Sequence, residues 1–400
     1  MSEFVERAFG VSEQIGYDAF RAHLLRNARF VASTTPAGFA AETCEIIGRH
    51  GAVLAAGTAY VPSVAELHQD VSALLHDPLV RTLALGGAEG ARRSTSVCNV
   101  VGEARAMHAQ AENDGAVVQA ASQFNLLEFP SPRVTPENGI QGYEFDRTQG
   151  PACAIACAAG TAYRNYLIPT PFGRPGAQRG QTAQCQINCL ADIEQAVIEK
   201  SGRALWDTVN GYVESDSSRL DELNALLAGT DGLEARLKSL LRIGVQENTQ
   251  VTHDKATYTS SHLGTVGGKI LTGSGAEPAA KHANRVTQAY ASALSIGYSS
   301  VEADRWCRLA RVVLDGAYEA TLLVGVKQTI TALAQGKPRP RILLTKVGGG
   351  VFENKIEWIV TAMARAVRKI SQHGVPLDIR VVHYGSVESQ YERLATPPVK

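Results

Sequence analysis

The chain has 400 residues, of which 44% are hydrophobic and 20% charged, a composition typical of a folded globular protein. Its 39 basic residues balance 39 acidic ones, so neither nucleic acid nor an anionic membrane is expected as a partner. No apolar run approaches the ~20 residues of a membrane span, and the first six residues do not resemble a signal peptide. Seven cysteines, an odd number, indicate reduced thiols and a cytoplasmic protein.

Residues 1–92 are predicted to form an N-terminal helical segment. Apolar residues recur there at helical spacing over 18–31, 37–47 and 64–75. A glycine-rich stretch at 86–90 then interrupts the pattern and predicts a linker. No site can be recognised in this segment, so we expect it to act as a scaffold.

The rest of the chain alternates between strand and helix patterns. Strands are predicted at 97–101, 117–121, 286–298, 340–345 and 377–382, and helices at 152–164, 303–333 and 356–371. This alternation predicts an α/β domain over 93–390, with a mixed sheet covered by helices on both faces. We expect an insertion at about 170–280, with helices at 190–200 and 220–241 and a long loop at 249–280.

A glycine-rich turn joins the strand at 340–345 to the helix at 356–371. It reads Gly-Gly-Gly-Val-Phe-Glu-Asn over 348–354. Bare backbone amides beside a helix N-terminus favour an anion such as a diphosphate. No Gly-Lys-Ser/Thr follows, which argues against hydrolysis of a nucleoside triphosphate. The alternative is a tight turn that needs positive φ angles, but three glycines exceed what one turn requires.

The loop after the strand at 117–121 is the second candidate site. It carries four carboxylates, on Glu128, Glu137, Glu144 and Asp146. Carboxylates beside a helix N-terminus stay ionised, and they can orient water or stabilise a developing positive charge. The alternative is that Asp146 caps the helix and the glutamates are solvated.

Three polar or bare residues flank these carboxylates. Asn125 follows the buried strand, and its amide can bind the hydroxyl groups of a ribose. Gln149 and Gly150 open the next helix, at a second N-terminal anion site.

The cysteines raise the possibility of a metal site. Cys153 and Cys157 are spaced i, i+4, as are Cys185 and Cys189, which would suit a four-thiolate zinc site. The first pair lies in an alanine-rich helix, where cysteine behaves as a small hydrophobic residue. We therefore predict no metal. His253, His262 and His282 also lack the spacing of metal ligands.

Four further polar residues are weaker candidates for ligand contacts. Glu103 ends an early strand and could accept a hydrogen bond from a purine amino group. Thr287 and Gln288 lie in a predicted strand, and Glu319 lies within an apolar helix, where it needs a partner or a polar cleft. The alternative for Glu103 is a solvated acid at the end of a strand, and for the other three it is a packing role.

The order of these parts resembles the macrodomain, an ADP-ribose-binding α/β/α sandwich. Four stretches, Gln-Phe-Asn-Leu-Leu-Glu at 123–128, Asp-Arg-Thr-Gln-Gly-Pro at 146–151, Tyr-Glu-Ala-Thr-Leu at 318–322 and Gly-Gly-Gly-Val-Phe at 348–352, resemble the divergent MavL-type macrodomains. Those are arginine-specific ADP-ribosyl hydrolases. The resemblance implies that Glu103 holds the adenine and Asn125 the ribose. The loops at 128–150 and 348–354 would hold the diphosphate and neighbouring ribose.

The predicted function is therefore hydrolysis of the bond between ADP-ribose and an arginine side chain of a modified protein. We expect Asp146 to be the main carboxylate, helped by Glu128, Glu144 and Gln149, with no cofactor. Further ligand contacts are predicted from Gly150, Gly348, Gly349, Gly350, Val351, Phe352, Glu353 and Asn354. No Gly-Gly-Gly with Gln-Glu-Glu follows Asn125, which favours a mono-ADP-ribosyl substrate over a poly(ADP-ribose) chain. The alternatives are an ADP-ribose reader without turnover and an NAD glycohydrolase.

Overall fold

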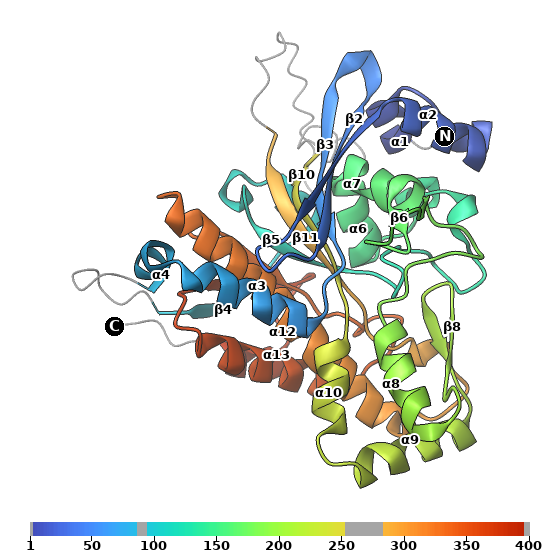
Figure 1. Cartoon of the computed structure of the whole chain (residues 1–400), viewed down its shortest axis with the longest axis vertical. Coiled ribbons are helices and arrows are strands. Elements are labelled where there is room, and N and C mark those ends of the chain that lie inside the picture. Colours follow the sequence, from blue (N-terminus) through green and yellow to red (C-terminus); the bar gives the residue numbers. More distant parts are fainter. Residues whose placement is uncertain (1–2, 86–93, 253–282, 396–400) are drawn as a thin grey trace, which may run out of the picture.

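Figure 1 shows the computed structural model, which describes residues 3–85, 94–252 and 283–395. A sheet of nine strands crosses it in the order β1-β2-β3-β10-β11-β5-β12-β13-β4. The strands are β1 (Ala28–Thr34), β2 (Ala40–Ile47), β3 (Val53–Tyr60), β4 (Ser96–Val101), β5 (Val117–Ala121), β10 (Gly244–Gln250), β11 (Arg285–Ala291), β12 (Arg341–Leu344) and β13 (Asp378–His383). Pairing is antiparallel from β1 to β11 and parallel from β11 to β4, so the sheet is mixed.

Helices cover both faces of the sheet, which confirms the predicted α/β class. They are α1 (Glu3–Phe9), α2 (Tyr17–Arg26), α3 (Val64–His76), α4 (Pro78–Leu85), α5 (Ala104–His108), α6 (Gln149–Ala156), α7 (Ala158–Ala162), α8 (Ala191–Ser201), α9 (Ser217–Gly229), α10 (Leu233–Leu240), α12 (Ala303–Ala334) and α13 (Ile356–Ser371). α12 packs against β5 and β11 together with α3, α4 and α13, whereas α6 and α7 pack on the opposite face (Figure 1).

The parallel half of the sheet positions the two predicted ligand loops. β5 is the centre of this half, between β11 and β12, and Val117–Ala120 are fully buried. Because parallel strands end at the same edge of a sheet, the loop after β5 and the glycine turn after β12 leave the sheet side by side. Gln119 of β5 fixes the α12 layer, since its amide donates to the Thr321 hydroxyl at 3.0 Å.

The helical prediction for residues 1–92 is wrong for much of the segment. The predicted helix at 37–47 is the strand β2, and 28–31 belongs to β1. Burial of β2 alternates along Glu42–Ile47, which is the period of a strand with one covered face. The helix at 64–75 is confirmed as α3, whose N-terminus has a capping box between Ser63 and Glu66. The predicted linker at 86–90 lies outside the described residues.

The excursion predicted at 170–280 is shorter than expected, because β10 returns to the main sheet at Gly244. The helix expected at 190–200 is confirmed as α8. The helix expected at 220–241 is two helices, α9 and α10, which are separated at Gly232 with a φ of 72°. Most of the loop expected at 249–280, with His253, His262 and His282, lies outside the described residues.

Two of the other predicted elements differ in their limits. The strand expected at 286–298 ends at Ala291. The helix expected at 152–164 begins at Gln149 and breaks at Cys157, whose φ and ψ are −127° and 70°. A π-helical turn, η6 (Tyr163–Leu167), follows α7. The helices α12 and α13 are confirmed.

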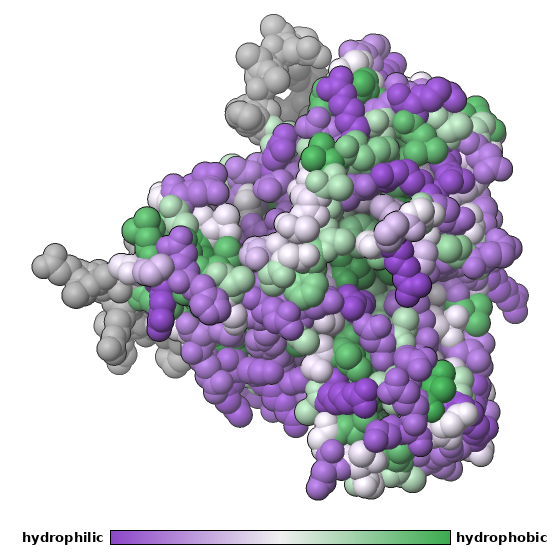
Figure 2. Space-filling view, in the orientation of Figure 1, coloured by the Kyte–Doolittle hydropathy of each residue, from purple (hydrophilic) through white to green (hydrophobic). Residues whose placement is uncertain are grey.

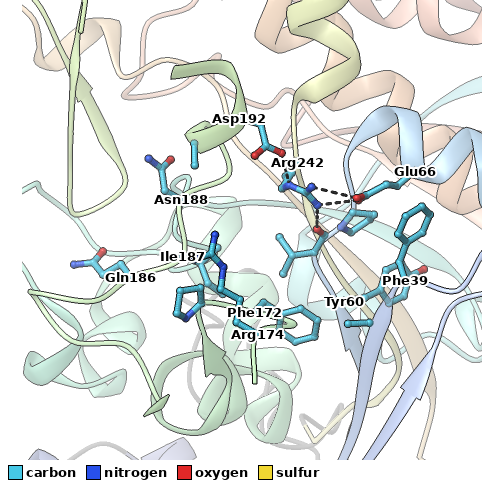
Figure 3. A pocket seen from close by; sticks show the side chains of 15 residues that line it. Phe39, Tyr60, Glu66, Phe172, Arg174, Gln186, Ile187, Asn188, Asp192 and Arg242 are labelled. Atoms are coloured by element: carbon cyan, nitrogen blue, oxygen red, sulfur yellow. Dashed lines mark hydrogen bonds and ion pairs between the residues drawn. The ribbon is translucent and has the colours of Figure 1, made fainter. Parts of the chain in front are cut away.

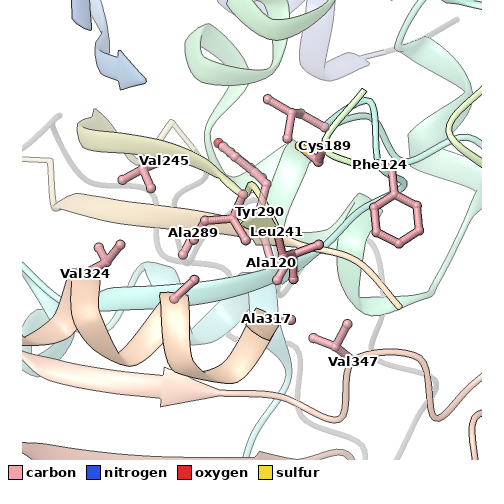
Figure 4. Packing of buried hydrophobic residues seen from close by; sticks show 14 of the residues in the cluster. Ala120, Phe124, Cys189, Leu241, Val245, Ala289, Tyr290, Ala317, Val324 and Val347 are labelled. Atoms are coloured by element: carbon pink, nitrogen blue, oxygen red, sulfur yellow. The ribbon is translucent and has the colours of Figure 1, made fainter. Parts of the chain in front are cut away.

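The hydrophobic core lies between the sheet and the helices on both faces. In Figure 4, Ala317 and Val324 of α12 approach the sheet from one side, and Tyr290 of β11 points to the other. Hydrophilic side chains cover most of the face shown in Figure 2, where a hydrophobic patch marks α4 with its exposed Leu79 and Leu83. Among the described helices, none is long and apolar enough to cross a bilayer.

Close packing of α12 on β12 depends on Gly325. A Cβ at this position would lie 2.3 Å from Cδ1 and 2.9 Å from Cγ1 of the fully buried Ile342. We expect Gly325→Val to lower the free energy of unfolding by about 1–3 kcal/mol, because the core has no room for the added carbons. Urea unfolding of both proteins measures this difference.

Gly229→Val is the matched control, since Gly229 ends α9 with open space around its Cα. Its effect should stay within about 0.5 kcal/mol, because valine and glycine differ little in helix propensity. Equal losses of stability in the two variants would contradict this view of the α12 interface.

Candidate functional site

A cavity of about 370 Å³ lies where the two predicted loops leave the sheet. The loop after β5 contributes Glu128, Asp146, Thr148, Gln149 and Gly150 to its lining, and the turn after β12 contributes Lys346, Gly348, Gly350, Val351 and Phe352. The two segments are about 200 residues apart in the chain, yet parallel strands bring them to one edge. The structure thus brings together two loops that we singled out independently in the sequence.

At each position of the turn after β12, a different structural feature explains why the residue is glycine. Gly348 has a φ of 77°, and a Cβ there would lie 2.4 Å from the Ala293 Cβ. A Cβ on Gly349 would collide with the side chain of Lys346, 2.4 Å from its Cγ. Gly350 has open space around its Cα and lines the cavity. Gly348 therefore fits the expectation of a turn that needs a positive φ, and Gly350 presents bare backbone to the cavity.

Glu128 is a fixed and buried carboxylate at the cavity. Only 2% of the residue is exposed, and its two oxygens accept hydrogen bonds from Nη2 of Arg164 at 2.9 and 3.2 Å. Its backbone N–H donates to the Tyr143 hydroxyl at 3.0 Å. Burial raises the pKa of Glu128 to about 7, although the ion pair and hydrogen bonds with Arg164 and Tyr143 act in the opposite direction.

Arg164 holds Glu128 in place, and sequence reasoning missed it. Its guanidinium comes from η6 and is 1% exposed. Besides Glu128, it donates to the Leu126 carbonyl at 2.9 Å and to the Tyr290 hydroxyl at 2.5 Å. An arginine within an apolar, alanine-rich stretch needs a buried partner, and this was the signal that could have identified it.

Asp146 also lines the cavity, but in a different environment. It is half-buried, and its Oδ1 accepts a hydrogen bond from the Thr148 N–H at 2.8 Å. The Thr148 side chain makes no capping bond to α6, so the first amides of this helix remain available to an anion. The cavity thus contains one buried carboxylate, one accessible carboxylate and an uncapped helix N-terminus.

Gln149 and Gly150 fix the start of α6 at the end of β5. The Gln149 side chain accepts from the Ala121 N–H at 2.7 Å and donates to the Gln119 carbonyl at 2.8 Å. A Cβ on Gly150 would lie 2.2 Å from the Ala121 carbonyl oxygen and 3.0 Å from Cγ of Glu128. Both residues line the cavity, and the glycine permits the helix to approach the carboxylate closely.

Aromatic rings form one wall of the cavity. Tyr212, Tyr298 and Phe352 pack edge-to-face with ring centroids 5.1 to 5.9 Å apart. Phe352 was predicted, but Tyr212 comes from β9 (Tyr212–Glu214) in the excursion and Tyr298 from the turn after β11. Sequence reasoning missed both tyrosines, because their contact joins segments that are distant in the chain.

Several predicted site residues lie outside the cavity lining, and Asn125, Glu103 and Glu144 are three of them. The Asn125 amide is fully buried, donating to Gln186 Oε1 at 2.8 Å and accepting from the Leu127 N–H at 3.1 Å. Glu103 caps α5 through the amides of the next turn. Glu144 accepts a hydrogen bond from the Phe4 N–H at 2.7 Å, beside α1. We leave these three out of the proposed site.

Most of the remaining candidates are buried parts of the scaffold. Thr287 and Gln288 are buried in β11, and Gln288 donates to the Cys153 carbonyl at 2.9 Å. Asn354 is buried, and its amide holds the glycine turn against the Leu294 carbonyl at 2.8 Å. Glu353 is exposed and lies outside the cavity lining.

Glu319 is the centre of an ion-pair network among helices rather than part of the cavity. His68 of α3 lies 2.7 Å and Lys238 of α10 2.9 Å from its oxygens, and Lys369 of α13 also binds it. Burial would raise its pKa, but the hydrogen bonds from His68, Lys369 and Lys238 lower it to about 2. Its need for a partner is therefore met by the basic side chains of three neighbouring helices.

The cysteines do not assemble a metal site. Burial raises the pKa of the thiols of Cys153, Cys157 and Cys189, which keeps them protonated. Among the described residues, no group of three or more His, Cys, Asp and Glu side chains is arranged to hold a metal ion.

A second, larger cavity of about 490 Å³ lies between β3, α3 and α8 (Figure 3). Its Arg242 is neutralised by Glu66 and Asp192 at 2.8 and 2.7 Å. It is lined by none of the residues that we predicted from the sequence. The smaller cavity is the better candidate site, because its carboxylates and bare amides can act on a ligand.

Neither a family model nor a curated protein matches the chain. Solved structures that resemble it include poly(ADP-ribose) glycohydrolases. The enzyme from Thermomonospora curvata bound to the inhibitor ADP-HPD is 11% identical, with 94% of this chain and 97% of that chain covered and a TM-score of 0.36. The enzyme from Deinococcus radiodurans in complex with ADP-ribose is 12% identical over 84% and 93%, with a TM-score of 0.34.

Removal of the Glu319 charge tests its structural role. Glu319→Gln should lower the free energy of unfolding at pH 7 by about 2–3 kcal/mol, because it weakens charge-assisted hydrogen bonds to a buried group. A lowered pKa contributes stability above the ordinary value of 4.5, and this is lost as the pH falls toward 2. The difference between variant and wild type in urea unfolding should therefore shrink below pH 4.5.

Glu234→Gln is the control, since Glu234 pairs with Arg308 at the surface with both side chains 46% exposed. Its cost should be at most about 1 kcal/mol. A Glu319 variant as stable as the wild type at pH 7 would contradict the assigned role.

Proposed function

We propose that the protein hydrolyses the N-glycosidic bond between ADP-ribose and an arginine side chain. The observation that carries this proposal is the pairing of Glu128 and Asp146 in one cavity with the glycine turn at 348–352 and the N-terminus of α6. An ADP-ribosyl substrate needs both kinds of group. The glycine turn and the helix N-terminus would bind the diphosphate, and the carboxylates would act at the anomeric carbon.

The diphosphate would lie between the backbone amides of the glycine turn and those at the N-terminus of α6. Gly350 presents backbone without a side chain to the cavity, and the first amides of α6 have no side-chain cap. Amides at a helix N-terminus bind phosphate through hydrogen bonds and the helix dipole. The wall of Tyr212, Tyr298 and Phe352 would pack against the rings of the ligand and exclude water.

Two carboxylates in different environments suit the two tasks of the reaction. Water adds to the anomeric carbon, the bond to the guanidine nitrogen breaks, and the leaving nitrogen takes up the proton that the water loses, so that the products are ADP-ribose and arginine. The transition state carries positive charge on the ribose, which an adjacent carboxylate stabilises. Glu128, with a pKa of about 7, is suited to accept the proton of the water at neutral pH. Asp146, nearer to solvent, would bind the guanidinium.

The proposed roles, with Glu128 as the base and Asp146 as the partner of the guanidinium, differ from the expectation from sequence that Asp146 is the main carboxylate. Glu128 is held on both oxygens by Arg164 and faces the cavity, so its position is fixed before a ligand binds. Preorganised groups contribute most to transition-state stabilisation. Glu144 makes its bond to the backbone of α1 and has no part in the proposed reaction.

Substitution of the two carboxylates tests the proposal. Glu128→Gln should lower kcat on ADP-ribosyl-arginine protein by about 10²–10⁴-fold, the range for loss of a general base. Asp146→Asn should raise KM more than it lowers kcat, because it removes a partner of the guanidinium. Release of ADP-ribose, measured by HPLC, gives both constants.

Glu137→Gln is the matched control from the same loop, since Glu137 binds the Ala183 N–H outside the cavity lining. Its kinetics should equal those of the wild type. Full turnover by the Glu128 variant would exclude the proposed base. Tight binding of ADP-ribose by a wild type that never cleaves the bond would show a reader, and release of nicotinamide from NAD would show a glycohydrolase of free NAD.

The raised pKa of Glu128 also predicts the pH profile. A general base acts in its deprotonated form, so kcat/KM should rise with pH and level off above about 7. This measurement uses the wild type and needs no substitution. A profile that is flat from pH 5 to 9, a range of about two units on each side of that value, would contradict the role of Glu128.

A further inference from the structure

Lys346 is the only positively charged side chain in the cavity lining, within the part of the chain that the structure describes. It lies two residues after Leu344, the last residue of β12, and precedes the glycine turn. The two carboxylates of the lining, Glu128 and Asp146, belong to the loop after β5. The cavity is therefore electrostatically divided, with its cation on the glycine turn.

The path of the Lys346 side chain is set by Gly349. A Cβ on Gly349 would lie 2.4 Å from Cγ and 2.7 Å from Cδ of Lys346. The aliphatic part of the lysine thus lies across the bare Cα of this glycine, and any larger residue there would displace it. The middle glycine of the turn serves to place a cation, which the sequence alone did not reveal.

The Lys346 ammonium is occupied by a carboxylate of the chain itself. Its Nζ lies 2.5 Å from Oε1 of Glu388, and the two side chains are 37% and 35% exposed. The other oxygen of Glu388 is buried and has no hydrogen-bond partner. A pair this exposed adds little to stability, and its carboxylate offers less negative charge than a diphosphate.

We propose that Lys346 binds the anionic part of the ligand and that Glu388 is its built-in competitor. A diphosphate on the glycine turn would displace Glu388 from Nζ, and the carboxylate would turn toward solvent. This inference rests on the proposed function only in that the ligand carries a diphosphate. Glu388 thereby lowers the affinity of the site for anions. It excludes those anions that bind Lys346 more weakly than its own carboxylate does.

The two members of the pair should have opposite effects, which a structural ion pair would not. Lys346→Gln should weaken binding of ADP-ribose about tenfold, the loss of one charge-assisted hydrogen bond. Glu388→Gln frees the lysine and should tighten binding severalfold. Isothermal titration calorimetry of the full chain with ADP-ribose, and separately with inorganic pyrophosphate, measures both changes.

Asp304→Asn is the matched control. Asp304 pairs with Lys355 at 2.6 Å just after the glycine turn, both side chains are exposed, and neither residue lines the cavity. Its affinities should equal those of the wild type. Lys346→Arg retains the charge and should recover most of the lost affinity, which separates the effect of charge from that of folding.

Two results would overturn the inference. Equal weakening by Lys346→Gln and Glu388→Gln would show a pair that only holds the fold, and unchanged affinity in both would show that Lys346 does not touch the anion. Failure of the proposed function can be distinguished from failure of this inference about Lys346 and Glu388. Opposite shifts with pyrophosphate in a protein that does not bind ADP-ribose would support the role of Lys346 and reject the function.

Discussion

The buried ion pair between Glu128 and Arg164 is the interaction on which the site depends. Arg164 also binds the Leu126 carbonyl and the Tyr290 hydroxyl, so one guanidinium connects the loop after β5, the π-helical turn after α7, and β11. Removing one member of a buried pair leaves the other charge uncompensated, which is costly. The same contacts that hold the loop to the sheet keep a carboxylate with a raised pKa at the cavity wall.

The topology of the sheet explains why this carboxylate lies beside the glycine turn. β5 lies between β11 and β12 in parallel pairing, so the loop after β5 and the turn after β12 leave from the same edge. Gly150 permits α6 to approach Glu128, and Gly349 permits Lys346 to lie across the turn. The chemistry of the cavity therefore follows from strand order and from close contacts that only glycine allows.

Sequence patterns predicted the parallel half of the sheet and both ligand loops, because buried strands, glycine runs and acidic loops are local signals. They misassigned β2, since a short apolar run with mixed polar residues fits either helix or strand until its neighbours are known. They could not reveal Arg164, Tyr212 or the contact of Lys346 with Glu388, because these depend on segments far apart in the chain. Asn125 was misplaced for the same reason, since Gln186 is the residue that binds its amide.

The most direct test of the central claim is a crystal structure of the protein with ADP-ribose. We expect the diphosphate to lie between Gly350 and the N-terminus of α6, with the anomeric carbon facing Glu128. Electron density for the ligand in the cavity of Arg242, Phe39 and Phe172, or its absence from both cavities at saturating concentration, would contradict the account.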